Sequence, residues 1–77
     1  MIFLIEYDRQ RAQIINFKSY SDEESSVAED ERLTLELDRN SQGVHNEVVL
    51  LQAESERALR RTHRRYFEDI RELIETS

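Results

Sequence analysis

The sequence predicts an α+β fold with the element order ββαβα, and three observations support this. Segments 2–7 and 14–20 are rich in β-branched and aromatic residues, which suit a pleated surface. Segment 47–53 contains a continuous apolar run bounded by polar residues, which is typical of a strand buried on both faces. Segments 22–41 and 56–75 carry helix start signals or helical periodicity. We therefore expect three strands and two helices.

Length and composition restrict the class of protein. The 77 residues carry 17 acidic and 11 basic side chains, for a formal net charge of -6, and no cysteine. A chain of this size forms one domain at most, so we interpret residues 1–77 as a single small α+β domain. Disulfides and thiolate zinc sites are excluded. The opening MIFLI run is too short for a transmembrane span, and we expect a cytoplasmic protein.

The first two strands are expected to form an antiparallel hairpin, because the connection between them, residues 8–12, is short and polar. This connection contains no glycine, which disfavours a two-residue type I′ turn. A longer loop or a turn with a bulge is predicted instead.

The first helix is expected over residues 22–41. Ser21 is followed three positions later by Glu24, the spacing of a capping box. Gly43, the single glycine, suits the left-handed position that ends a helix. Residues 32–38 leave an alternative open, because the alternating sequence LTLEL within them also fits a half-buried strand.

The second helix is expected over residues 56–75, with Ser55 as its N-cap. Its apolar residues fall on one half of a helical wheel and its charged residues on the other. Among its apolar positions are Leu59 and Tyr66.

The first strand is the most apolar, so it is predicted to lie in the centre of the sheet, in the order 2-1-3. A strand–helix–strand crossover within one sheet is almost always right-handed. The third strand should then run parallel to the second. The predicted architecture is a three-stranded mixed sheet with both helices on one face.

Alternation along the strands makes both sheet faces apolar, and two helices on one side can cover only one of them. An uncovered apolar face of this size marks an interaction surface. Its residues are predicted to be Ile2, Leu4, Ile14, Val49 and Leu51. A second copy is the simplest cover, because two-fold dimers are the commonest soluble assembly. A loop or the C-terminal helix is the alternative cover. The sequence thus favours a non-enzymatic interaction or adaptor module that forms a homodimer or higher oligomer, with room for an unidentified protein partner.

The last helix also carries five arginines spaced as a stripe, which gives an alternative function. They are Arg57, Arg60, Arg61, Arg64 and Arg65. Guanidinium groups bind phosphate oxygens in pairs of hydrogen bonds, so the stripe could hold nucleic acid. A solvated face, or pairing with the acidic segment 22–38, explains the same pattern.

Catalytic and cofactor sites are not expected. His45 and Glu47 form an H-x-E pair, and His63 is the only other histidine, whereas zinc needs three or four convergent ligands. One glycine cannot build a phosphate-binding loop or a dinucleotide fingerprint. We therefore predict no catalytic residue, no metal ligand and no cofactor.

Overall fold

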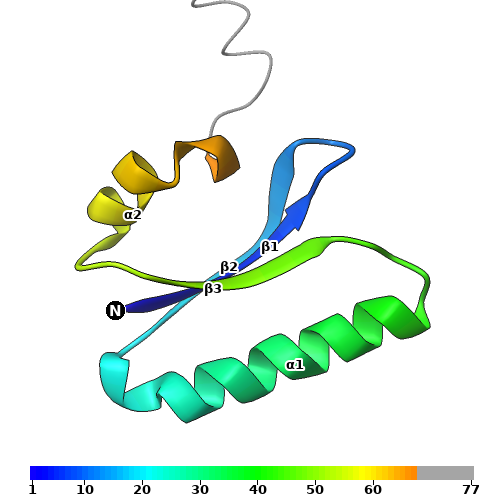
Figure 1. The fold of residues 1–77 in the computed structure, drawn as a ribbon, viewed down its shortest axis with the longest axis horizontal. Coiled ribbons are helices and arrows are strands. Elements are labelled where there is room, and N and C mark those ends of the chain that lie inside the picture. The colour runs from blue at the N-terminus through cyan, green and yellow to red at the C-terminus, as the bar shows by residue number, and fades with distance from the viewer. Residues whose placement is uncertain (68–77) are drawn as a thin grey trace, which may run out of the picture.

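The elements follow the predicted ββαβα order in the computed structural model, which describes residues 1–67. The chain runs through β1 (Ile2–Asp8), β2 (Gln13–Tyr20), the 3₁₀ turn η1 (Asp22–Glu24), α1 (Ser25–Ser41), β3 (Glu47–Gln52), α2 (Glu56–Thr62) and the 3₁₀ turn η2 (Arg64–Tyr66). In Figure 1 the sheet lies between α1 on one side and α2 on the other.

The hairpin between β1 and β2 has the predicted longer loop together with a bulge. The Asp8 carboxylate accepts hydrogen bonds from the backbone N–H groups of Gln10 and Arg11, at 3.0 and 3.2 Å, which fixes the turn. Within the ladder Glu6 faces Asn16 while Tyr7 faces Ile14. Ile15 is therefore the extra, bulged residue of β2.

The helix predicted over residues 22–41 is confirmed as η1 followed by α1, and the alternative strand over 32–38 is wrong. The capping box forms, with the Ser21 backbone N–H donating to the Glu24 carboxylate at 3.0 Å. Gly43 follows the helix with φ at +72°, the left-handed conformation that glycine adopts without strain.

The second helix is shorter than predicted, because α2 ends at Thr62. The Thr62 hydroxyl donates to the Ala58 carbonyl oxygen at 3.1 Å, and His63 leaves the helical conformation at φ -121° and ψ 52°. Tyr66 then packs edge-on against Tyr7 with ring centroids 5.3 Å apart. The chain after Thr62 therefore forms η2, which packs on the sheet, instead of continuing α2. The part of the prediction beyond residue 67 lies outside the described residues.

The strand order 2-1-3 is confirmed, but the sheet is antiparallel throughout rather than mixed. β2 and β3 each pair antiparallel with β1 and so run in the same direction. They never pair with each other, because the central strand β1 separates them. The crossover through α1 therefore creates no parallel ladder.

The prediction that both helices cover one face is also wrong, since α1 and α2 lie on opposite faces (Figure 1). The α1-side cluster consists of Ile2, Leu4, Tyr20, Ala28 and Val48, with Leu35 and Leu50 packed against it. The α2-side cluster is built on Phe3, Ile5, Tyr7, Leu59 and Tyr66. Each fully buried apolar side chain contributes about 1.5–3 kcal/mol. Because α1 already covers one face, burying Leu59 and Tyr66 on the other is the more favourable packing.

Candidate functional site: sheet faces, polar clamp and free edges

The five residues predicted to form one exposed apolar face do not share a face. Ile2 and Leu4 are buried in the α1-side cluster. The other three pack, partly buried, against the α2-side cluster; they are Ile14, Val49 and Leu51. The bulge at Ile15 moves Ile14 to the opposite face from Leu4. The pairing of Leu4 with Leu50 assigns Leu50, rather than Val49 or Leu51, to the α1 side.

The arginine stripe is divided between two elements and partly engaged within the chain. Arg60 pairs with Glu56 at 3.2 Å and lies 4.6 Å from the centre of the Phe67 ring. Arg65 donates to the Glu47 carboxylate at 2.9 Å, and this hydrogen bond raises the pKa of its guanidinium.

Of the remaining arginines, Arg57 and Arg61 are exposed on α2, and Arg64 lies on η2. Because α2 stops at Thr62, the five side chains do not form the continuous helical stripe that the sequence predicts.

A buried carboxylate, Glu6, joins four parts of the chain, and the sequence analysis did not identify it. Asn16 of β2 donates to Glu6 Oε1 at 2.6 Å, and Asn46, just before β3, donates to Oε2 at 2.8 Å. From α1, Arg39 Nε donates to Oε2 at 2.7 Å. We call these four residues the polar clamp: Glu6, Asn16, Arg39 and Asn46.

The polar clamp holds Glu6 in its charged form, although the side chain has no exposed surface. Burial by itself raises the pKa of Glu6. The hydrogen bonds from Arg39, Asn46 and Asn16 and the positive charge of Arg39 outweigh burial and lower the pKa below its ordinary value. A carboxylate with every oxygen engaged has no free position for proton transfer, so the clamp is a structural feature.

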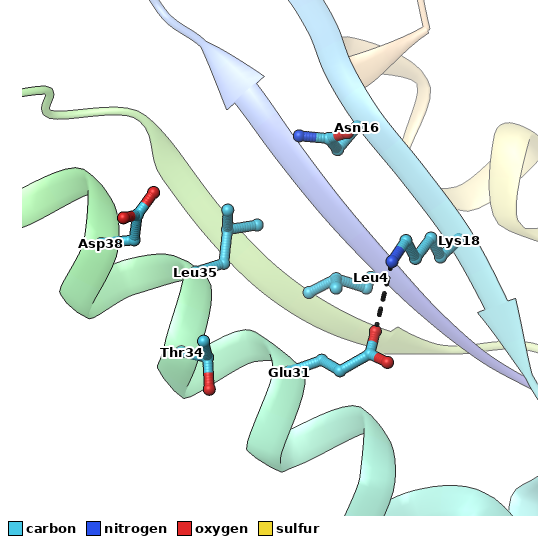
Figure 2. Close-up of a pocket in the computed structure, with 7 residues that line it drawn as sticks. All are labelled: Leu4, Asn16, Lys18, Glu31, Thr34, Leu35 and Asp38. Carbon is cyan, nitrogen blue, oxygen red and sulfur yellow. Dashed lines mark hydrogen bonds and ion pairs between the residues drawn. The ribbon is translucent and has the colours of Figure 1, made fainter.

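A groove of about 440 Å³ separates α1 from β2 (Figure 2). Its floor is apolar, from Leu4 and Leu35, and its rims are polar. Lys18 on β2 and Glu31 on α1 reach across it at 3.5 Å, as Figure 2 shows. The Tyr20 hydroxyl also donates to Glu31; burial first, and this hydrogen bond second, raise the pKa of Tyr20 to about 12. These contacts tie β2 to α1 across the groove.

The outer edge of β3 is apolar and open. Val48, Val49, Leu50 and Leu51 form an uninterrupted apolar run, and only Val48 among them is buried. β3 is an edge strand, because β1 is its only neighbour in the sheet formed by the described residues. An edge strand normally carries a charged residue, a proline or a bulge that discourages further pairing. β3 has none of these between Glu47 and Gln52.

The part of the chain that the structure describes contains no candidate metal site and no candidate membrane-spanning helix. No group of three or more histidine, cysteine or acidic side chains within residues 1–67 is arranged to hold a metal ion. His63 contacts the Thr62 hydroxyl through Nδ1 at 2.9 Å. Within the same range no helix has the length and apolar character needed to cross a bilayer.

Comparison with protein-family models, with curated proteins and with solved structures found no match. The function is therefore inferred from the geometry alone.

Proposed function

We propose that the chain is a small non-enzymatic protein-interaction module that self-associates. One observation carries the proposal: β3 is an edge strand with the sequence of an interior strand. Three of its apolar side chains, Val49, Leu50 and Leu51, are only partly buried, and a further strand beside β3 would cover them. Exposed strand edges of this kind pair with other chains.

The sheet faces do not support the proposal, because both carry helices in the described residues. The interaction surface is therefore the sheet edge rather than the apolar face predicted from the sequence. Small domains gain stability from such association, since a single core of this size buries little surface.

Light scattering coupled to size-exclusion chromatography tests the proposal. We expect a mass twice the 9.3 kDa of one chain, falling toward 9.3 kDa on dilution. The variant Gln52→Pro should remain folded but monomeric, because proline removes a backbone N–H and is tolerated at the end of an edge strand. Dimer affinity should fall by about 100-fold, since the proline ring also obstructs the incoming strand.

Gln52→Ala is the matched control, because it removes the same side chain and keeps the N–H. This variant should dimerise like the unmodified chain. A mass of one chain at every concentration would exclude self-association.

Arg57 and Arg61 support a second candidate function, nucleic-acid binding. They lie one turn apart on α2, are exposed, and have no ion-pair partner among the described residues. Binding through phosphates weakens steeply with rising salt, whereas apolar edge pairing persists. Titration of a labelled oligonucleotide at low and high salt, with Arg57→Glu and Arg61→Glu as variants, separates the two functions.

A further inference from the structure

The backbone hydrogen bonds at one end of β3 show which of its groups point outward. The Met1 N-terminal amine donates to the Ala53 carbonyl oxygen at 2.9 Å, and the Ala53 N–H donates to the Met1 carbonyl oxygen at 3.1 Å. Residues that exchange both hydrogen bonds alternate along an antiparallel ladder with residues that exchange none. The next bonded pairs are therefore Phe3 with Leu51, Ile5 with Val49 and Tyr7 with Glu47.

It follows that Val48, Leu50 and Gln52 direct their backbone N–H and C=O groups away from β1. Within residues 1–67 none of these groups has a hydrogen-bond partner. The free edge thus presents donors and acceptors at alternate residues, in the pattern that a further antiparallel strand requires.

We propose that this strand is β3 of a second copy, paired antiparallel about a two-fold axis perpendicular to the sheet, with Leu50 facing the partner's Leu50. This proposal rests on the proposed self-association and specifies its register. Such an interface is isologous, so the same residues are used on both chains. The two sheets then join into one continuous sheet, with α1 of both copies on the same face.

The register follows from the outward groups. With Leu50 on the axis, Val48 faces the partner's Gln52 and Gln52 faces the partner's Val48. Every outward N–H and C=O of the strand is then paired. An axis at Val49 would place Gln52 opposite the partner's Asn46, beyond the strand. An axis at Leu51 would place Val48 opposite the partner's Glu54, also beyond it.

The side chains are complementary in the same register. On the α2 side, Val49 lies beside the partner's Leu51, and on the α1 side Leu50 lies beside the partner's Leu50. These side chains are only partly buried in one copy. A hollow of about 220 Å³ beside β3 would also become covered; it is lined by Ile2, Ser25, Glu29, Leu50, Leu51 and Gln52.

Charge complementarity also favours a second copy as the occupant. Ser25 and Glu29 place one flank of α1 on the β3 side, and helical spacing adds Arg32 and Glu36 to that flank. Arg32 pairs with Glu36 at 2.9 Å within one chain. The two-fold axis brings the two helices alongside one another in opposite directions. Opposite charges are then present on the two flanks that meet, Arg32 on one and Glu29 and Glu36 on the other.

Residue-resolved amide hydrogen exchange of the unmodified chain, at high and low protein concentration, tests the register. The amides of Val48, Leu50 and Gln52 should exchange about tenfold faster or more on dilution to monomer. The amides of Val49 and Leu51 should not change, because they donate to β1 in both states. A dimer by light scattering without this alternation would overturn the register and leave self-association standing. A monomer at every concentration would overturn both.

Disulfide trapping gives an independent readout, because the chain contains no cysteine of its own. In the proposed register the Cα atoms of two Leu50→Cys residues are about 5.5 Å apart, within disulfide range. Two Gln52→Cys residues are more than about 13 Å apart. Leu50→Cys should therefore cross-link to itself on oxidation and Gln52→Cys should not, whereas a mixture of Gln52→Cys and Val48→Cys should cross-link. Cross-linking of Gln52→Cys alone would overturn the register.

Discussion

β2 and β3 are the two edges of the same sheet, but they are protected differently. β2 contains a bulge at Ile15, which interrupts its outer edge, and an exposed lysine, Lys18. β3 contains neither feature, and its residues between Glu47 and Gln52 are all apolar. The comparison supports the proposal that β3, rather than β2, is the edge that pairs with another strand.

The two edges also differ in how α1 holds them. The polar clamp at Glu6 holds α1 to the central strand β1, and Glu31 holds α1 to β2 by accepting from Tyr20 and pairing with Lys18. On the β3 side the contacts of α1 include apolar packing of Leu35 in the cluster that contains Val48 and Leu50. Hydrogen bonds and ion pairs set the position of α1 on the sheet. The apolar side chains on the β3 side could pack in addition against a second copy of the chain.

The largest effect on stability is expected from Glu6→Gln in the polar clamp. It is measured by urea unfolding in the Gln52→Pro background, where association does not contribute. The amide has one acceptor oxygen in place of two and no charge, so Arg39 loses one of its two hydrogen bonds and its charged partner, and one asparagine loses its acceptor. We expect a loss of about 2 kcal/mol, below the roughly 3–5 typical of a fully buried pair because Arg39 keeps some solvent exposure.

Glu36→Gln is the control for Glu6→Gln. It removes the partly exposed pair with Arg32 and should cost less than about 0.5 kcal/mol. Equal losses of stability for the two variants would show that the polar clamp does not hold α1 to the sheet.

The stabilisation of the fold by the polar clamp should depend on pH, because it requires the charged form of Glu6. The folded-state pKa of Glu6 lies below its ordinary value, so its stabilising contribution is present above about pH 4.5 and is lost as the pH falls through the folded-state pKa. The stability difference between the Gln52→Pro chain and the same chain with Glu6→Gln should therefore shrink as the pH falls below about 4.5. A difference independent of pH in this window would contradict the assignment.

The smallest effect is expected from Lys18→Val, which makes β2 resemble β3. In the Gln52→Pro background this variant should remain largely monomeric by light scattering, with self-association rising by less than about tenfold, because the bulge at Ile15 still interrupts the edge. Recovery of the dimer affinity of the unmodified chain would show that one lysine accounts for the difference between the edges.

Local signals in the sequence predict most of the elements. Ser21, Glu24 and Gly43 define the first helix, and the apolar character of the first strand places it in the centre of the sheet. The face that each helix covers is not a local property. Helical periodicity places Leu59 on the apolar side of the second helix, but it does not show against which face of the sheet that side packs.

The prediction that Ile14 shares a face with Leu4 was wrong because of the register between β1 and β2. One bulged residue reverses the alternation that follows it, so Ile14 lies on the face opposite Leu4. The polar clamp was missed although a charged residue within an apolar strand, Glu6, was a visible signal. Its partners Arg39 and Asn46 lie 33 and 40 residues away along the chain, and only the fold brings them together.

The most direct test of the central claim is an isotope-filtered nuclear Overhauser measurement on mixed labelled and unlabelled chains. Facing residues that exchange no hydrogen bond bring their Hα atoms closest in an antiparallel pair. We expect a strong intermolecular contact between the Hα atoms of Val49 and the partner's Leu51. Intermolecular contacts confined to β2 or to the outer surface of α1 would contradict the account.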